Sequence, residues 1–206
     1  NRFFHKVKKQ YPITSYNLSN PYRMVYVSGI HPYKHQCNVV DAVSKLRNQG
    51  LPLVLELVGP SYPSSLLQLK EKLSVLDPDE KWIIYHGKLP YGRIDEIYYK
   101  SNLGVFASSC ENMPNILLEK MAAGLPIACS DRSPMPEILG DDGVYFNPES
   151  PAEIASALLK LINSPDLRYK KACASFKKST DFSWDSCSAN TFSFFEEVIS
   201  NYKNYS

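Results

Sequence analysis

Short segments rich in β-branched and other apolar residues alternate along most of this chain with segments whose apolar residues recur at helical spacing. The short segments, such as LVLELVG, are apolar on both faces, as strands covered by helices on both sides must be. Strict alternation of this kind predicts an α/β fold, a Rossmann-like, doubly wound parallel sheet with helices on both faces. We expect about six strands, at 23–29, 51–59, 81–87, 103–109, 125–130 and 143–148, and helices at 36–50, 64–76, 93–101, 114–123, 134–139, 151–163, 166–178 and 184–203.

The alternation divides the chain into three parts. Residues 1–22 show no clear period and are expected to be a linker, or an arm from a preceding domain. Residues 23–183 form the predicted α/β domain, and residues 184–206 a C-terminal helix. Because the chain begins at Asn1 without a methionine, we expect a fragment of a longer protein. No apolar run approaches the roughly 18 residues that a membrane span needs.

Charge and motif content exclude several classes of protein. The 23 Lys and Arg against 21 Asp and Glu give a net charge of +2, which argues against a dedicated nucleic-acid-binding protein. The five cysteines are widely spaced without a C-x-x-C motif, as in a cytosolic protein with reduced thiols. His31 and His35 have the spacing of a zinc pair, but Pro32 interrupts any helix there and no third ligand is near, so we expect no metal site. No G-x-G-x-x-G, P-loop or G-x-S-x-G motif is present.

In a doubly wound sheet, ligands bind beyond the carboxyl ends of the strands, in the loops that follow them. The loop at 108–114 is the richest in chemistry. Pro114 suits the first position of a helix, which places Glu111 in the loop before it. The free N–H groups at the start of that helix form a potential anion site.

Glu119 lies in the same helix, about 7–8 Å further along the axis, among apolar neighbours. A carboxylate buried there needs a hydrogen-bonding partner, and the two hydroxyls of a nucleotide ribose are one candidate. The alternatives are a salt bridge within the fold, or a thin exposed stripe shared with Lys120.

Two further loops carry candidate residues. Lys34 stands just before a helix, where it either reaches a phosphate or is solvated. The segment YHGKLPYG, at 85–92, either contacts a flat base edge or is a simple connection.

The segment ENMPNILLEKMAAGLPI (111–127) resembles the signature of the retaining glycosyltransferases of family 4. That signature has two glutamates separated by seven residues, then an Ala/Gly-rich helix end and a strand that starts G-x-P. YVSGIHPYKH (26–35) resembles the family's first strand and phosphate loop, and 135–162 resembles its usual sequel. The resemblance runs from about Met24 to Phe195.

Such enzymes have a GT-B fold of two Rossmann-like domains, and the resemblance covers only the second, nucleotide-sugar-binding domain. It implies that Glu119 holds the ribose hydroxyls and that Glu111 is the catalytic residue beside the donor sugar. It implies no metal and no other cofactor, because the helix dipole and cations stabilise the leaving diphosphate. The remaining implied donor-binding residues are Lys34 at the diphosphate, Leu89 at the base, and Asn112, Met113, Pro114 and Asn115 at the diphosphate or sugar. The family usually has an Arg where this chain has Gly29, and Arg132 or a residue of the missing domain is a candidate replacement.

The resemblance implies transfer of a sugar from a nucleoside diphosphate to a hydroxyl of a glycan or lipid-linked acceptor, with retention. Bacterial surface polysaccharide, such as lipopolysaccharide, is the expected product, made in the cytoplasm with peripheral contact to the inner membrane. The fragment alone is expected to be inactive without the N-terminal domain. The alternatives are a non-catalytic nucleotide-sugar-binding module and a Rossmann oxidoreductase or epimerase. The nucleobase, sugar, acceptor, linkage and oligomeric state stay open.

Overall fold

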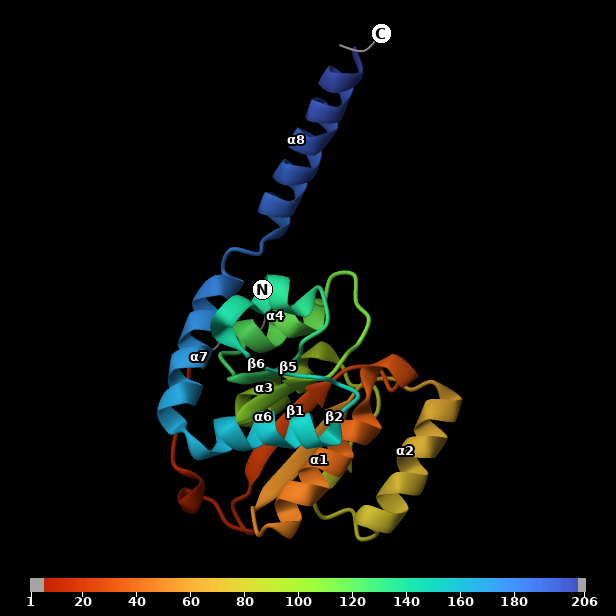
Figure 1. The fold of residues 1–206 in the computed structure, drawn as a ribbon, viewed down its shortest axis with the longest axis vertical. Coiled ribbons are helices and arrows are strands. Elements are labelled where there is room, and N and C mark those ends of the chain that lie inside the picture. Colours follow the sequence, from red (N-terminus) through yellow and green to blue (C-terminus); the bar gives the residue numbers. More distant parts are fainter. Residues whose placement is uncertain (1–5, 204–206) are drawn as a thin grey trace.

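The fold is built on one parallel sheet, seen in a computed structural model that describes residues 6–203 (Figure 1). Its six strands lie in the order β3-β2-β1-β4-β5-β6, and every neighbouring pair is parallel. This order confirms the predicted doubly wound sheet, in which the chain starts at the centre and builds outward in both directions. The strands are β1 (Tyr22–Val27), β2 (Leu53–Val58), β3 (Ile83–Tyr85), β4 (Leu103–Phe106), β5 (Ile127–Ser130) and β6 (Val144–Phe146).

Helices cover both faces of the sheet. Side chains of a strand alternate between its faces, and those of β1 are apolar on both. In β1, Met24 and Tyr26 belong to the core beneath α1 and α6, whereas Val25 and Val27 pack with residues of α3 and α4. Helix α7 packs against α4 and α6. The helices are α1 (Gln36–Asn48), α2 (Pro63–Leu76), α3 (Tyr91–Lys100), α4 (Asn115–Ala122), α5 (Met135–Leu139), α6 (Pro151–Asn163), α7 (Pro165–Ser179) and α8 (Trp184–Lys203).

The strands are shorter than the apolar runs that predicted them. The run at 51–59 contains a strand only at Leu53–Val58, because Pro52 has no N–H for the ladder and Gly59 has a φ of 148°. A Cβ at Gly59 would overlap the carbonyl oxygen of Ser28, so the loops after β1 and β2 touch at the carboxyl edge of the sheet. Helix α4 begins one residue later than expected, with Pro114 as its N-cap.

Arg168 in α7 fixes the segment before β1 to the domain. Its side chain is fully buried, and its guanidinium donates hydrogen bonds to the carbonyl oxygens of Leu161 at 2.7 Å and Ile162 at 2.6 Å, at the end of α6. It also donates to Gln10 Oε1 at 2.9 Å and to the carbonyl oxygen of Tyr11. Part of the region predicted as a linker or arm therefore lies against the domain. Residues 1–5 of that region, and 204–206 of the predicted C-terminal helix, lie outside the described residues.

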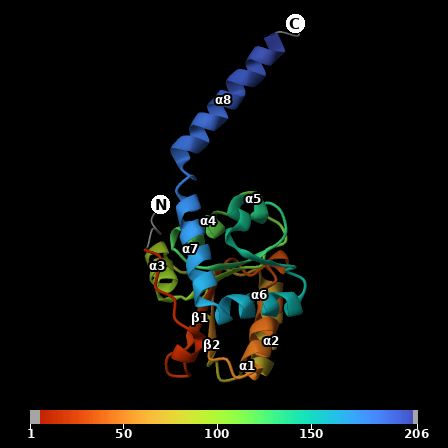
Figure 2. The same ribbon diagram turned by 60° about the vertical axis from the view of Figure 1, so that its left-hand side comes forward.

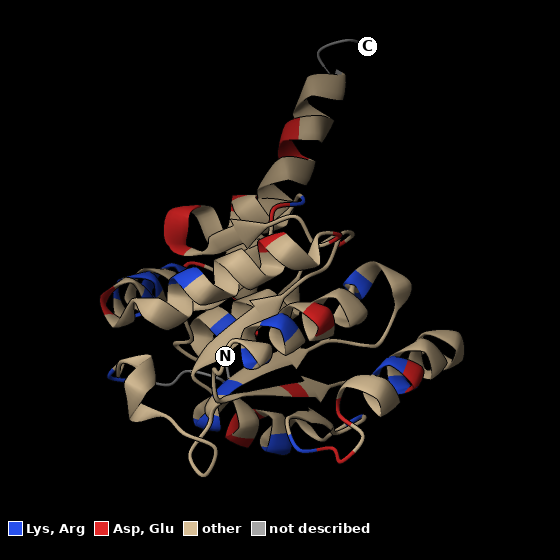
Figure 3. Cartoon of the chain, turned by 60° about the horizontal axis from the view of Figure 1, so that its bottom comes forward, with Lys and Arg blue, Asp and Glu red and all other residues tan. Residues whose placement is uncertain are grey.

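Helix α8 projects away from the domain (Figure 2). Its large apolar side chains are exposed, among them Trp184, Phe192, Phe195 and Ile199. No described helix, α8 included, combines the length and the apolar composition that crossing a membrane requires. Lys and Arg are intermixed with Asp and Glu over the helices that cover the sheet, consistent with the small net charge (Figure 3).

Candidate functional site

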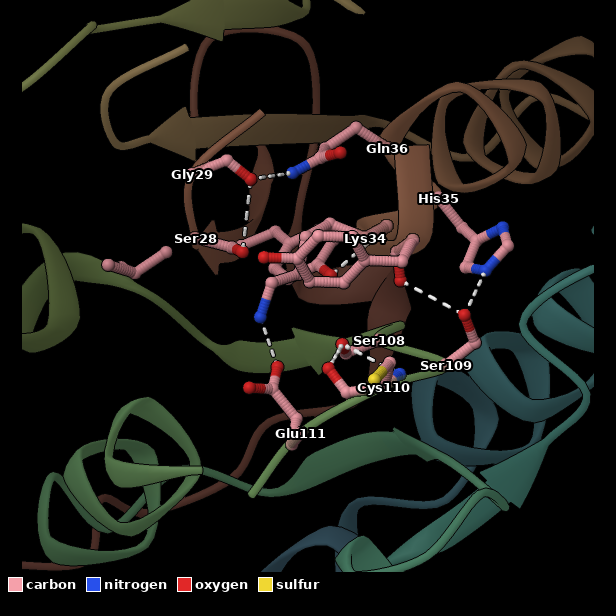
Figure 4. A network of polar contacts seen from close by, with 12 residues as sticks. Ser28, Gly29, Lys34, His35, Gln36, Ser108, Ser109, Cys110 and Glu111 are labelled. Carbon is pink, nitrogen blue, oxygen red and sulfur yellow. Dashed lines mark hydrogen bonds and ion pairs between the residues drawn. The ribbon is translucent and has the colours of Figure 1, made fainter. Parts of the chain in front are cut away.

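Lys34 and Glu111 meet at the carboxyl edge of the sheet, although 77 residues separate them in the sequence (Figure 4). Lys34 ends a short 3-10 helix, η2 (Pro32–Lys34), in the loop after β1, and Glu111 lies in the loop after β4. Their side chains form an ion pair and are 9% and 15% exposed. Lys34 is therefore not the solvated lysine of the alternative interpretation. The structure brings together the cation and the carboxylate that the sequence singled out separately.

Backbone and side-chain hydrogen bonds hold this pair in place. The hydroxyl of Tyr26 donates to the carbonyl oxygen of Lys34 at 2.7 Å. The Ser109 amide donates to the carbonyl oxygen of Tyr33 at 2.9 Å, and the Ser109 hydroxyl lies 2.9 Å from His35 Nε2. These hydrogen bonds join the loops after β1 and β4, so the backbone that carries the pair is held in place before any ligand binds.

His35 links the Lys34 loop to helix α1. Its backbone is left-handed, with φ 50° and ψ 33°, which turns the chain sharply from η2 into α1. The first residue of that helix, Gln36, donates from its side chain to the carbonyl oxygen of Gly29 at 2.7 Å. Burial lowers the pKa of His35. The neutral imidazole is thereby favoured in the loop.

The ion pair with Glu111 leaves N–H donors of the Lys34 ammonium group available to a ligand. A lysine ammonium has three N–H donors, and one of them faces Glu111. The rings of Tyr33 and Phe106 lie 5.1 Å and 5.6 Å from Lys34 Nζ, measured to their centroids, and restrict its position. An anion at this point would meet a fixed charge rather than a mobile surface lysine.

The start of α4 presents the predicted donor-binding segment. Asn112, Met113 and Asn115 are exposed, whereas Pro114 is buried. The amide N–H of Asn115 donates to the carbonyl oxygen of Met113 at 2.9 Å, so this amide is engaged within the loop. Pro114 has no N–H, so anion binding by the amides of Asn112, Met113 and Asn115 together requires this turn to open.

Glu119, on the same helix, is half-buried. It accepts a hydrogen bond from the hydroxyl of Tyr98 in α3 at 3.2 Å. It forms no ion pair with any residue in the described part of the chain, and Lys120 is fully buried rather than exposed beside it. The structure thus shows neither the salt bridge nor the exposed stripe weighed for Glu119. Burial raises the pKa of this carboxyl.

Leu89 lies in the loop after β3, half-buried against the apolar cluster that includes Tyr98 and Ala122. The base-side candidate and the tyrosine that binds Glu119 therefore share one packed cluster. Leu89 also lines a hollow of about 480 Å³. Charged groups border this hollow, where Glu56 accepts from Arg23 Nη1 at 2.9 Å and lies 2.9 Å from His86 Nε2.

Gly29 and Arg132 occupy the positions relevant to the missing arginine. A Cβ at Gly29 would lie 3.0 Å from the ring of His31, so the histidine fills part of the space beside it. Arg132 donates to Asn147 Oδ1 at 3.1 Å and pairs with Asp131 at 3.7 Å. The structure therefore gives Arg132 partners of its own, and its role toward a diphosphate stays a prediction.

Lys120 is the residue that sequence reasoning missed. It is fully buried in α4, although it was expected only as a possible surface neighbour of Glu119. A sequence signal was available, because Lys120 lies three residues after the buried Leu117, on the same face of the helix.

The model of the family described as glycosyl transferases group 1 matches residues 21–164. The chain belongs to this family. It is 25% identical over 182 residues to O-antigen chain mannosyltransferase B of Escherichia coli, covering 87% of this chain and 47% of that protein. It is 30% identical over 146 residues to MMP alpha-(1->4)-mannosyltransferase of Mycolicibacterium hassiacum, covering 65% of this chain and 36% of that protein. The chain thus spans less than half the length of these curated relatives.

Solved structures show the same fold. The C-terminal domain of a group 1 family glycosyl transferase from Francisella tularensis matches with a TM-score of 0.71 and 23% identity, over 87% of this chain and 94% of that one. Anabaena HepE, solved in complex with UDP, matches with a TM-score of 0.71 and 18% identity, over 80% of this chain and 45% of that one. The expected Rossmann-like fold is confirmed, and it is the fold of the C-terminal domain of that Francisella protein. The roles of individual site residues stay predictions.

Proposed function

We propose that this group 1 family chain is the donor-binding domain of a retaining glycosyltransferase, which moves a sugar from a nucleoside diphosphate to an acceptor hydroxyl. The observation that carries this proposal is the largely buried Lys34–Glu111 pair, which lies at the carboxyl edge of the sheet beside the start of α4. The mannosyltransferases among the relatives and the UDP in a structural neighbour support a sugar nucleotide as the ligand.

The site offers a distinct partner for each part of such a donor. Lys34 faces the diphosphate with its remaining N–H donors, and the positive end of α4 adds a partial charge of about +0.5. Glu119 accepts hydrogen bonds from the ribose hydroxyls while Tyr98 holds it in orientation. Leu89 contacts the base from the loop after β3. No metal is needed to hold the diphosphate in this arrangement.

Catalysis then consists mainly of stabilising charge as the sugar–phosphate bond breaks. The diphosphate gains negative charge, which Lys34 and the start of α4 offset. The sugar gains oxocarbenium character, which the carboxylate of Glu111 stabilises. The acceptor hydroxyl attacks the anomeric carbon from the side of the departing diphosphate, its proton passes to a phosphate oxygen, and configuration is retained. The remainder of the protein supplies the acceptor.

The O-antigen relative supports a role in bacterial surface polysaccharide synthesis. In that role we expect the enzyme in the cytoplasm, in peripheral contact with the inner membrane, acting on a glycan or lipid-linked acceptor. A non-catalytic nucleotide-sugar-binding module has the same donor site, so an assay of the longer protein for donor hydrolysis or transfer separates the two.

The 206-residue chain is expected to bind nucleotide but to transfer no sugar, because it provides one wall of a two-domain cleft. The measurement is nucleoside diphosphate release from UDP-sugars and GDP-sugars, with and without simple sugar acceptors. Turnover by this chain at a rate typical of enzymes, about 1 s⁻¹ or faster, would contradict the expectation.

Replacing Glu119 with alanine is expected to remove the preference for a ribonucleotide. Hydrogen bonds to a charged group contribute roughly 1.5–3 kcal/mol, so affinity should fall about tenfold to a hundredfold. The measurement is calorimetric titration with UDP or GDP, whichever binds more tightly, and with its 2′-deoxy analogue. Wild type should discriminate between them, and Glu119→Ala should not.

Two further variants sharpen this test. Glu119→Gln keeps one acceptor oxygen and should lose less affinity. Tyr98→Phe removes the hydroxyl that donates to Glu119 but keeps the carboxylate, so it should retain discrimination. Equal discrimination by wild type and Glu119→Ala would assign Glu119 a structural role instead.

A further inference from the structure

Lys120 is a fully buried lysine that belongs to no ion pair in the described part of the chain. Its ammonium group donates to the carbonyl oxygen of Val27, at the carboxyl end of β1, at 3.3 Å. The rings of Phe106, Tyr26 and Tyr98 surround it, with centroids 5.0, 5.8 and 5.9 Å from Nζ. Such a site disfavours the charged form, because three rings and one carbonyl replace water incompletely.

The absence of a side chain at Gly104 makes room for Lys120. Gly104 in β4 lies opposite α4, and a Cβ there would stand 3.1 Å from Cδ of Lys120. The glycine therefore leaves room for the methylene chain of the lysine to pass over β4 and reach the carbonyl oxygen of Val27 in the neighbouring strand β1. The burial of Lys120 thus depends on two neighbouring elements, α4 and β4.

The ammonium group lies next to the candidate donor site. Phe106 joins them, since its ring centroid is 5.0 Å from Lys120 Nζ and 5.6 Å from Lys34 Nζ. Tyr26 joins them as well, because it donates to the backbone of Lys34 while its ring faces Lys120. The titratable groups that face Lys120 from the surrounding elements are Tyr26 of β1, Tyr98 of α3, Glu119 of α4, Cys129 of β5, Lys34 and Glu111.

We propose that Lys120 is a buried cation beneath the donor site, which takes up a proton from solvent when an anionic diphosphate binds beside Lys34. This role rests on the proposed donor site and deepens it. Lys120 supplies charge through the protein without touching the ligand, in a chain whose loop after β1 carries Lys34 but has Gly29 rather than a basic residue five positions before it.

The pH dependence of ligand affinity follows from the pKa of Lys120 in the free protein. Burial lowers the pKa of Lys120 to about 7. A bound anion favours the ammonium form and raises this pKa, so the ligand binds more tightly where the proton is already present. Affinity should therefore fall as the pH rises from below 7 to above the pKa of the complex. When ligand binding raises the pKa of Lys120 by about one pH unit, the affinity falls about tenfold across this range. At pH 7.5 the complex then takes up about half a proton as it forms.

The test compares wild type with Lys120→Met, whose unbranched side chain can occupy the space over Gly104 without a charge. Lys160→Met removes a lysine from the exposed side of α6 and is the matched control. UDP and GDP are titrated by calorimetry between pH 6 and pH 9, in two buffers of different ionisation enthalpy, so that proton uptake is measured directly. Titration of the ligand's own phosphate and of His35 is common to all three proteins.

Wild type and Lys160→Met should lose about tenfold more affinity than Lys120→Met between pH 6 and pH 9, and only they should take up the additional proton. Circular dichroism should show Lys120→Met folded, since an apolar side chain replaces a buried charge. Equal pH profiles and proton uptake in all three proteins would overturn the role of Lys120 while leaving the donor site intact. Failure of wild type to bind either nucleotide would overturn the proposed function, and the role of Lys120 with it.

Discussion

Replacing Lys34 with alanine is expected to weaken nucleoside diphosphate binding by about a hundredfold and to leave the affinity for the bare nucleoside unchanged. The substitution removes a charge-assisted hydrogen bond to the diphosphate. It also leaves the largely buried carboxylate of Glu111 without its cation, beside an incoming anion. Both effects act against the diphosphate and neither against the base. Isothermal titration with the diphosphate and the nucleoside measures the difference.

The double variant Lys34→Ala/Glu111→Gln separates the two effects. Because it removes the repelling carboxylate, it should bind the diphosphate more tightly than Lys34→Ala alone, though less tightly than wild type. Lys45→Ala, which removes an exposed lysine from α1, is the control for a change in net charge. Arg132→Ala tests the other candidate cation. A Lys34→Ala protein that still prefers diphosphate over nucleoside as strongly as wild type would show that Lys34 only holds the loop.

Replacing Arg168 with alanine is expected to lower the free energy of unfolding by about 3–5 kcal/mol, since each buried acceptor left without a donor costs about 1–3 kcal/mol. The side chain is fully buried, and four acceptors on α6 and on the segment before β1 would lose their donor. For a chain of this size, the melting temperature should fall by roughly 10 °C. Urea denaturation monitored by circular dichroism measures the change.

Lys170→Ala is the matched control for Arg168, because it removes a basic side chain from the exposed face of the same helix. Its stability should stay within about 0.5 kcal/mol of wild type. Nucleotide affinity at a temperature where both proteins are folded should be unchanged, since Arg168 lies away from the carboxyl edge. An Arg168→Ala protein as stable as wild type would mean that the segment before β1 adds nothing to the fold.

The sheet could be predicted because its signal is local. Each strand is a short run that is apolar on both faces, as in LGVFASS around β4, and each helix repeats its apolar residues at helical spacing. Boundaries were less exact, since residues such as Pro52 and Gly59 end a strand through backbone geometry rather than through hydrophobicity.

The site could be predicted only in part. Glu111 and Lys34 stood out from their loops, but their meeting depends on how the loops after β1 and β4 fold together, 77 residues apart. The helical spacing from Leu117 places Lys120 on a buried face, but the room for its side chain depends on Gly104 in a neighbouring strand, which no local pattern reveals. A lysine in a helix is normally solvated, and this general rule wrongly predicts an exposed position for Lys120.

Binding of the nucleoside diphosphate portion of a sugar donor to this chain can be measured by titrating the chain with UDP, GDP and the matching nucleosides in a calorimeter at pH 7. We expect at least one diphosphate to bind with a dissociation constant of about 1 mM or tighter, and at least about tenfold more tightly than its nucleoside. A folded chain that binds neither diphosphate at millimolar concentration, or binds nucleoside and diphosphate equally, would contradict it.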